Sequence, residues 1–378
     1  MIYQLIFVLI ALFGIPLFQT NNKNHNIDEQ KKRYIIFVCI IMVLQSGLRN
    51  LAVGADTYAY YLDFQSVGYS SWNELISKFV LYYTERIGKD PGYPLLVKLF
   101  YSIIPDYRCF LIAVAAFFFY SLGKLINKYL NNIYEIFLGV LVYQTLFYEF
   151  FSITGIRQTI ATGLALLSIK YAVRHKIIPF ILIILFASTI HKSVFLFFIF
   201  YILCYLKNSK ILLTLSALGF IPMWLFGKAI SSALITQNFD NYAVYLQGSE
   251  NAGAYGFTAF IIIIFILILV KYRVLIFNGR YNYIFINAIG IGLFLTPLTA
   301  LDPSNMRIVQ YFSIFIIIII PQIIYNFTTN PRINQNLRSL FIIVFISLMI
   351  MRSQPYAFAW QEMALGDNYK EYKLIQME

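Results

Sequence analysis

Apolar segments of membrane-spanning length recur along nearly the whole 378-residue chain. Two of the longest runs, Phe260–Val270 and Ile314–Ile320, contain only apolar side chains. Hydrophobic residues make up 60% of the chain and charged residues only 12%. Runs of this kind in so apolar a chain are typical of polytopic membrane proteins. We therefore predict an all-α, polytopic membrane bundle of about twelve transmembrane helices.

The charges between these segments predict an orientation. The expected spans lie at about residues 2–18, 34–48, 107–123, 132–150, 153–173, 177–191, 194–206, 211–227, 255–270, 283–300, 307–327 and 338–353. Alternate connections carry clusters of Lys and Arg, which the positive-inside rule assigns to the cytoplasm, with both termini outside. This arrangement accounts for the net charge of +12 without a nucleic-acid partner. We expect one integral membrane domain over residues 1–378.

Two long connections fall on the outer side, at about residues 49–106 and 228–254. In the first, Ser71 and Glu74 form a capping-box pattern, and apolar residues follow from Trp72 at helical spacing. This pattern predicts a helix lying in the membrane interface. Residues 91–104 are apolar but too short to span comfortably, so we expect an interfacial or re-entrant helix there. A long loop that returns to the membrane surface suits a substrate with one end in lipid.

A basic turn at residues 174–176 joins two expected spans into a hairpin. Arg157 precedes this turn by about seventeen residues and His191 follows it by about fifteen, so at about 1.5 Å per residue both lie near the opposite membrane face. The span that begins near Arg157 carries a stripe of small or polar residues, which marks close helix contact inside a bundle. The stripe comprises Thr154, Arg157, Gln158, Ala161, Ala165, Ser168 and Ala172. We therefore expect Arg157 to point inward, close to His191.

Several ionisable residues share the outer ends of spans in this topology: Arg49, Asp56, Glu149, Arg157, His191, Lys192, Asp302 and Arg307. Charges are costly in a bilayer, about 2.5–3.5 kcal/mol at a helix centre, and often mark functional sites. Convergent arginines and a histidine suit a lipid-linked diphosphate, because arginine offers bidentate donors to phosphate oxygens. Such donors also stabilise charge on a departing diphosphate, and Asp56 or neutral His191 would remove a proton from an attacking sugar hydroxyl. Two alternatives remain open: Arg49 and Lys192 also suit contacts with headgroups, and Arg307 suits an ion pair with Asp302.

Motifs for other chemistries do not occur. The sequence has no Asp-x-Asp pair, no His-x-x-x-His and no Cys-x-x-Cys, and its three cysteines, Cys39, Cys109 and Cys204, lie in apolar segments. It also lacks a phosphate-binding GxxxxGK[ST] loop and a Gly-x-Ser-x-Gly nucleophile elbow. We predict a metal-independent glycosyl transfer that uses no cofactor.

Three groups of residues resemble the EpsG family of exopolysaccharide and capsule polymerases, the Wzy-like group. The first is the Ser-Gly-Leu-Arg stretch at residues 46–49, followed by Gly54-x-Asp56-x-x-x-Tyr60. The second is Gly155-Ile156-Arg157-Gln158-x-x-Ala161, which opens a span. The third is His191-Lys192-Ser193 at the end of the next span, and Arg307 at the start of a late span adds support.

The resemblance implies a membrane glycosyltransferase that polymerises oligosaccharide repeat units of exopolysaccharide, capsule or O-antigen. It would transfer the growing glycan from undecaprenyl diphosphate to a lipid-linked repeat unit at the outer leaflet of the bacterial cytoplasmic membrane. A flippase and a chain-length regulator of the same pathway would be its partners, beside the bilayer itself. Carried over to this sequence, the catalytic residues would be Asp56, Arg157 and His191, and the substrate-binding residues Arg49, Tyr60, Gln158, Lys192 and Arg307.

Three other functions compete with this one. A flippase for the same lipid-linked sugar is favoured by broken helices at mid-membrane, whereas the ionisable residues here gather at one face. An acyltransferase with His191 as base would face the cytoplasm, where the loops are short and basic. A glycosyltransferase that adds single sugars from polyprenyl phosphate shares the outer-loop acid with our prediction and stays open.

Overall fold

The computed structural model describes residues 2–19, 27–238, 254–301, 305–352 and 354–365. Within these ranges the chain is helical and contains no strand; a single isolated bridge pairs Arg49 with Phe358. Each of the twelve expected spans contains a helix, so the prediction of an all-α helical bundle is confirmed. The chain divides into two compact units, which are described separately: residues 1–167, 189–191 and 339–378, and residues 168–188 and 192–338.

The first unit holds the N-terminal helices, the outer-loop helices and the end of the last helix. Its long helices are α1 (Ile2–Phe18), α2 (Ile27–Gly47), α6 (Tyr107–Tyr129), α7 (Ile133–Leu146), the start of α8 (Ile156–Ala172) and the end of α17 (Pro331–Arg352). A π-helix, η1 (Glu149–Thr154), separates α7 from α8. The helices of the outer loop are α3 (Thr57–Tyr69), α4 (Trp72–Glu85) and α5 (Gly92–Ile103).

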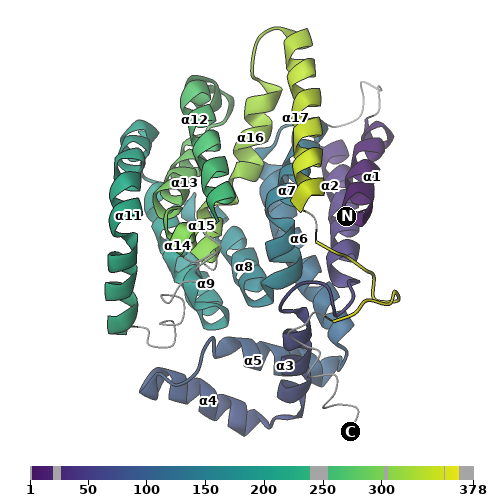
Figure 1. The fold of residues 1–378 in the computed structure, drawn as a ribbon, viewed down its shortest axis with the longest axis vertical. Coiled ribbons are helices and arrows are strands. Elements are labelled where there is room, and N and C mark those ends of the chain that lie inside the picture. Colours follow the sequence, from purple (N-terminus) through teal and green to yellow (C-terminus); the bar gives the residue numbers. More distant parts are fainter. Residues whose placement is uncertain (1, 20–26, 239–253, 302–304, 353, 366–378) are drawn as a thin grey trace. The chain divides into compact units, whose positions relative to one another are not determined.

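The outer loop folds into these three helices (Figure 1); α4 and α5 match the helices predicted from the capping and apolar pattern, whereas α3 was not predicted. Ser71 Oγ accepts a hydrogen bond from the Glu74 backbone N–H at 3.2 Å, which starts α4. The Glu74 carboxylate also accepts from Lys78 Nζ at 2.6 Å. Helix α5 has only twelve residues, about 18 Å at the usual rise, so it is too short to cross the hydrocarbon core.

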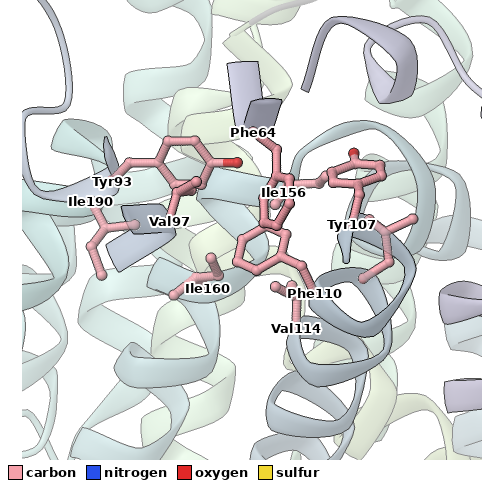
Figure 2. Close-up of a cluster of buried hydrophobic side chains, with 10 residues drawn as sticks. Phe64, Tyr93, Val97, Tyr107, Phe110, Val114, Ile156, Ile160 and Ile190 are labelled. Carbon is pink, nitrogen blue, oxygen red and sulfur yellow. The ribbon is translucent and has the colours of Figure 1, made fainter. Parts of the chain in front are cut away.

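A cluster of buried apolar side chains fixes α3 and α5 against the ends of α6, α8 and α9 (Figure 2). Phe64 of α3 lies at its centre, 5.4 Å from Phe110 between ring centroids. The other members are Tyr93, Val97, Tyr107, Leu111, Val114, Ile156, Ile160 and Ile190. Burial of large apolar and aromatic side chains is the main stabilising term in such a cluster. Helices α3 and α5 of the outer loop are therefore anchored by this cluster.

Gly54 allows the chain to enter α3 beside the π-helix. Its φ of +86° is a conformation that residues with a Cβ rarely adopt, and a Cβ there would overlap the Ile153 side chain. Steric constraints therefore explain why the Gly54-x-Asp56 motif has glycine at its first position.

The second unit contains the remaining helices: α9 (Ile177–Ile190), the 3₁₀-helix η2 (Lys192–Phe197), α10 (Phe198–Leu203), α11 (Ser209–Asn238), α12 (Tyr255–Asn278), α13 (Asn282–Leu295), α14 (Leu298–Leu301), α15 (Met306–Ser313) and α16 (Ile316–Tyr325). The last residues of α9 belong to the first unit. Stacked rings of Phe200, Phe285 and Phe315 fill its core, with Phe285 and Phe315 centroids 5.1 Å apart.

Five helices in the described ranges are long and apolar enough to cross a membrane, and the pair α15 and α16, bent by 47°, makes a sixth. Shorter apolar helices of 10–17 residues account for further expected spans. The chain is therefore a membrane protein, and the count of twelve crossings stays a prediction. The expected outer loop at 228–254 lies partly outside the described residues, and α11 continues to Asn238.

Candidate functional site

Helix α8 presents Arg157 in its first turn, directly after the π-helix and Gly155. The small residues of its predicted stripe are buried: Ala161, Ala165, Ser168 and Ala172 have exposed fractions of 0%. This confirms that the stripe is a contact face inside the bundle. The guanidinium of Arg157, by contrast, is 23% exposed, so it reaches the rim of the unit.

Two carboxylates hold the Arg157 guanidinium. Nη1 lies 3.5 Å from Asp90 Oδ2, and Nη2 lies 3.2 Å from Asp63 Oδ2. The two partners differ in exposure, since the Asp90 side chain is fully buried whereas that of Asp63 is 54% exposed. A buried ion pair loses several kcal/mol when one partner is removed, but an exposed pair is worth only about 0–1 kcal/mol. Asp90 is therefore the fixed counter-ion of Arg157, and Asp63 is an exchangeable one.

His191 meets the same carboxylate oxygen. Its Nδ1 lies 3.4 Å from Asp90 Oδ2, and the histidine side chain is 9% exposed. A carboxylate accepts from an Nδ1–H, and in the neutral tautomer that donates this bond the imidazole carries its lone pair on Nε2. One oxygen of Asp90 thus links Arg157 at the start of α8 to His191 at the end of α9.

The backbone around Asp90 is shaped for this position. Asp90 has a φ of +50°, and the turn before α5 also contains Arg86 and Gly88 with positive φ. A Cβ on Gly92 would overlap the Thr189 side chain and lie 3.0 Å from its carbonyl carbon. The missing side chain at Gly92 therefore lets the start of α5 lie directly against the end of α9.

Two tyrosine rings flank the guanidinium. Arg157 Cζ lies 4.9 Å from the ring centroid of Tyr93 and 5.5 Å from that of Tyr60, within cation–π range. Tyr93 is 2% exposed, and burial raises the pKa of its phenol well above the usual value. Its hydroxyl therefore stays protonated and available as a hydrogen-bond donor. We refer to Tyr60, Asp63, Asp90, Tyr93, Arg157 and His191 as the Arg157 cluster.

Three of the predicted site residues, Arg157, His191 and Tyr60, belong to this cluster, and the pairing of Arg157 with His191 is confirmed. Asp56 is the residue before α3, four positions from Tyr60 and seven from Asp63. This spacing places it on the same helix face. Gln158 is 2% exposed and lies within the bundle. The roles assigned to these residues stay predictions.

Arg49 lies in a separate, buried environment. Its guanidinium donates to the backbone carbonyls of Ser46 and Ile153 and to Thr57 Oγ1, and the residue is 4% exposed. These bonds join the end of α2, the start of α3 and the π-helix. The geometry therefore favours a structural role over the predicted contact with substrate.

Lys192 and Arg307 belong to the second unit. Lys192 starts η2 directly after His191, and Arg307 lies in the first turn of α15. The alternative ion pair of Arg307 with Asp302 lies outside the described residues, because Asp302 is not among them.

Sequence reasoning missed Asp63, Asp90 and Tyr93. Asp63 was detectable, because it falls three residues after Tyr60 on the same helix face. No local pattern distinguishes Asp90 or Tyr93, since their partner Arg157 is distant in sequence. In the described part of the chain no three His, Cys, Asp or Glu residues are grouped as metal ligands would be.

A model of the EpsG family matches residues 32–372, nearly the whole chain. The chain belongs to the EpsG family. No curated protein and no solved structure matches the sequence or the fold. The matched region contains every residue of the Arg157 cluster, and EpsG membership indicates a membrane protein of polysaccharide-polymerase type.

Proposed function

We propose that this EpsG-family chain is a metal-independent glycosyltransferase that polymerises lipid-linked oligosaccharide repeat units at the outer face of the bacterial cytoplasmic membrane. The donor would be a glycan on undecaprenyl diphosphate, and the acceptor a lipid-linked repeat unit. The observation that carries the proposal is the shared contact of Arg157 and His191 with Asp90 Oδ2. A permanently charged group and a proton acceptor are thereby held side by side.

This pairing supports one chemical step. His191 Nε2 takes the proton of the acceptor hydroxyl, whose oxygen forms a bond to the anomeric carbon of the donor. The bond from that carbon to the diphosphate oxygen breaks, and the diphosphate leaves with the electron pair. Arg157 stabilises the charge on the departing group with planar, charge-assisted hydrogen bonds. Asp90 holds the imidazole in the required tautomer.

Before the diphosphate of the donor can bind Arg157, Asp63 has to give up its own contact with that guanidinium. With neutral His191, the two carboxylates and one guanidinium leave the cluster with an excess negative charge, which repels a diphosphate. Exchange of the exposed Asp63 carboxylate for the diphosphate removes this repulsion and keeps Arg157 neutralised. Asp63 therefore occupies the diphosphate's place while the site is empty.

This role predicts that Asp63→Asn binds inorganic pyrophosphate more tightly than the wild type, by up to about fivefold, because the competing exposed ion pair is lost. Calorimetric titration of the purified protein in nanodiscs measures the change. Glu74→Gln is the matched control, since it removes an exposed carboxylate of the same loop that pairs with Lys78 instead. Equal or weaker pyrophosphate binding by Asp63→Asn would contradict the exchange.

The function itself is tested by replacing the gene with an Arg157→Ala variant and examining the lipid-linked glycans of the cell. A polymerase predicts single repeat units that accumulate on the outer leaflet and a loss of high-molecular-weight polymer, compared at equal amounts of variant and wild-type protein in the membrane. Accumulation on the inner leaflet would indicate a flippase instead. Repeat units that lack one sugar would indicate a glycosyltransferase that adds single residues.

A further inference from the structure

A cavity of about 520 Å³ opens in the first unit, away from the residues of the Arg157 cluster. Its walls come from the segment before α3, from the π-helix and from the C-terminal segment of residues 354–365. Its polar lining residues are Tyr58, Glu149, Thr154 and Gln354, set among small and apolar side chains. The volume lies in the range of about 300–1,000 Å³ that is usual for small-molecule sites. Tyr58 and Tyr60 are two positions apart on α3, so they point to opposite sides of that helix.

The cavity wall is held by hydrogen bonds between distant parts of the chain. Asn50 N–H donates to the Ala357 carbonyl at 2.9 Å, and Ala359 N–H donates to the Leu48 carbonyl at 2.8 Å. Tyr356 donates its hydroxyl proton to the Gln45 carbonyl. On the other side, the wide turn of the π-helix positions Glu149 and Thr154; such turns are frequent at functional sites. The C-terminal segment is thus fixed as a wall of a preformed site.

A small polar chamber adjoins this cavity and shares Glu149, Ile153 and Gln354 with it. The chamber has a volume of about 20 Å³, enough for one water molecule or one hydroxyl group. Gln4, Gln144 and Tyr148 line it and are 8%, 4% and 1% exposed. Gln4 Oε1, Gln144 Oε1 and Tyr148 Oη have no hydrogen-bond partner within the described ranges. Buried polar atoms are normally paired, so these three are set to bind a hydroxyl-bearing guest.

We propose that this cavity is a saccharide-binding site, which holds a sugar of the acceptor repeat unit with one hydroxyl in the polar chamber. The amide, carboxylate and phenol groups match sugar hydroxyls, which both donate and accept. Arg352 joins the chamber wall beside Glu149, so the acidic and basic charges balance and favour an uncharged sugar. An isoprenoid tail would leave the buried amide and phenol atoms unpaired, which is costly. The identity of the guest as an acceptor glycan rests on the proposed function.

Ala52→Trp fills the cavity and tests the proposal, and Ala59→Trp is its matched control, because Ala59 is exposed on α3 and does not line the cavity. The probes are the repeat-unit oligosaccharide released from the strain's own lipid-linked glycan and inorganic pyrophosphate. Binding of each to the purified full chain in nanodiscs is measured by saturation-transfer NMR and calorimetry. We expect Ala52→Trp to lose oligosaccharide binding and keep pyrophosphate binding, and Ala59→Trp to keep both. Gln354→Ala, which removes one wall amide, should weaken oligosaccharide binding about two- to tenfold.

Oligosaccharide binding that is absent in the wild type, or unchanged in both Ala52→Trp and Gln354→Ala, would overturn the saccharide site. Gln354→Ala decides the matter if the tryptophan variant does not fold. The proposed function fails by a different result, namely pyrophosphate binding that is absent or insensitive to Arg157→Ala. Oligosaccharide binding therefore tests the saccharide site, and pyrophosphate binding tests the proposed function.

Discussion

Replacing Asp90 with asparagine is expected to lower polymer formation by about 10²- to 10⁴-fold, the range for loss of a positioned proton-transfer group. The change removes the buried negative charge beside Arg157 and the acceptor that orients His191. Asparagine has nearly the same shape and tolerates the positive φ of this position, so the fold should persist. The measurement is the length and yield of polymer formed by purified protein from lipid-linked repeat units.

Asp63→Asn serves as the comparison for Asp90→Asn, because both changes remove one carboxylate from Arg157. The two variants should differ in their effects. Asp90→Asn, which removes the buried carboxylate, should lose activity, whereas Asp63→Asn, which removes the exposed one, should gain affinity for pyrophosphate. Polymer of normal length and yield from the Asp90→Asn protein would contradict the central place of this residue.

The second large effect is expected at Arg49, where replacement with alanine should destabilise the protein by about 3–5 kcal/mol, because three hydrogen bonds from a charged donor are lost. The guanidinium donates to two backbone carbonyls and a threonine hydroxyl in a buried position, and its removal takes away these three hydrogen bonds. We expect low amounts of Arg49→Ala protein in the membrane and an early thermal transition in detergent.

Arg157→Lys is the matched arginine variant and should reach normal amounts, because it keeps a positive charge beside the buried Asp90 carboxylate and changes a side chain at the rim. A stable Arg49→Ala protein that forms no polymer would instead support the sequence-based prediction that Arg49 binds substrate. The comparison of protein amount with polymer yield distinguishes the two arginines.

The helices were largely predictable from the sequence, because apolar runs and capping residues act locally. The start of α4 at Ser71 and the turn between α8 and α9 follow from such patterns. Helix boundaries were less predictable: α2 begins at Ile27 and not near residue 34, because a helix continues through charged residues beyond the apolar run.

From residue spacing, the site was predictable only where two residues lie on one hairpin; Tyr60 was predicted from the family resemblance. Arg157 and His191 are set at the same level by helix rise and turn position, which the sequence contains. Asp90 is 67 residues from Arg157 and 101 from His191, in a turn with left-handed backbone. Its contact with both depends on the packing of α5 against α9, and no periodicity in one sequence encodes such a distant approach. The cavity beside the π-helix depends in the same way on a C-terminal segment that returns to α2.

In the proposed reaction, the single oxygen that Asp90 offers to two partners would set the order of events, as follows. When the imidazole becomes cationic, its attraction to that oxygen rises, and the guanidinium on the other side is held less tightly. Arg157 is then released toward the diphosphate at the moment when the leaving group gains charge. Deprotonation of the acceptor and stabilisation of the leaving group would therefore advance together, so that neither half of the transfer runs far ahead of the other.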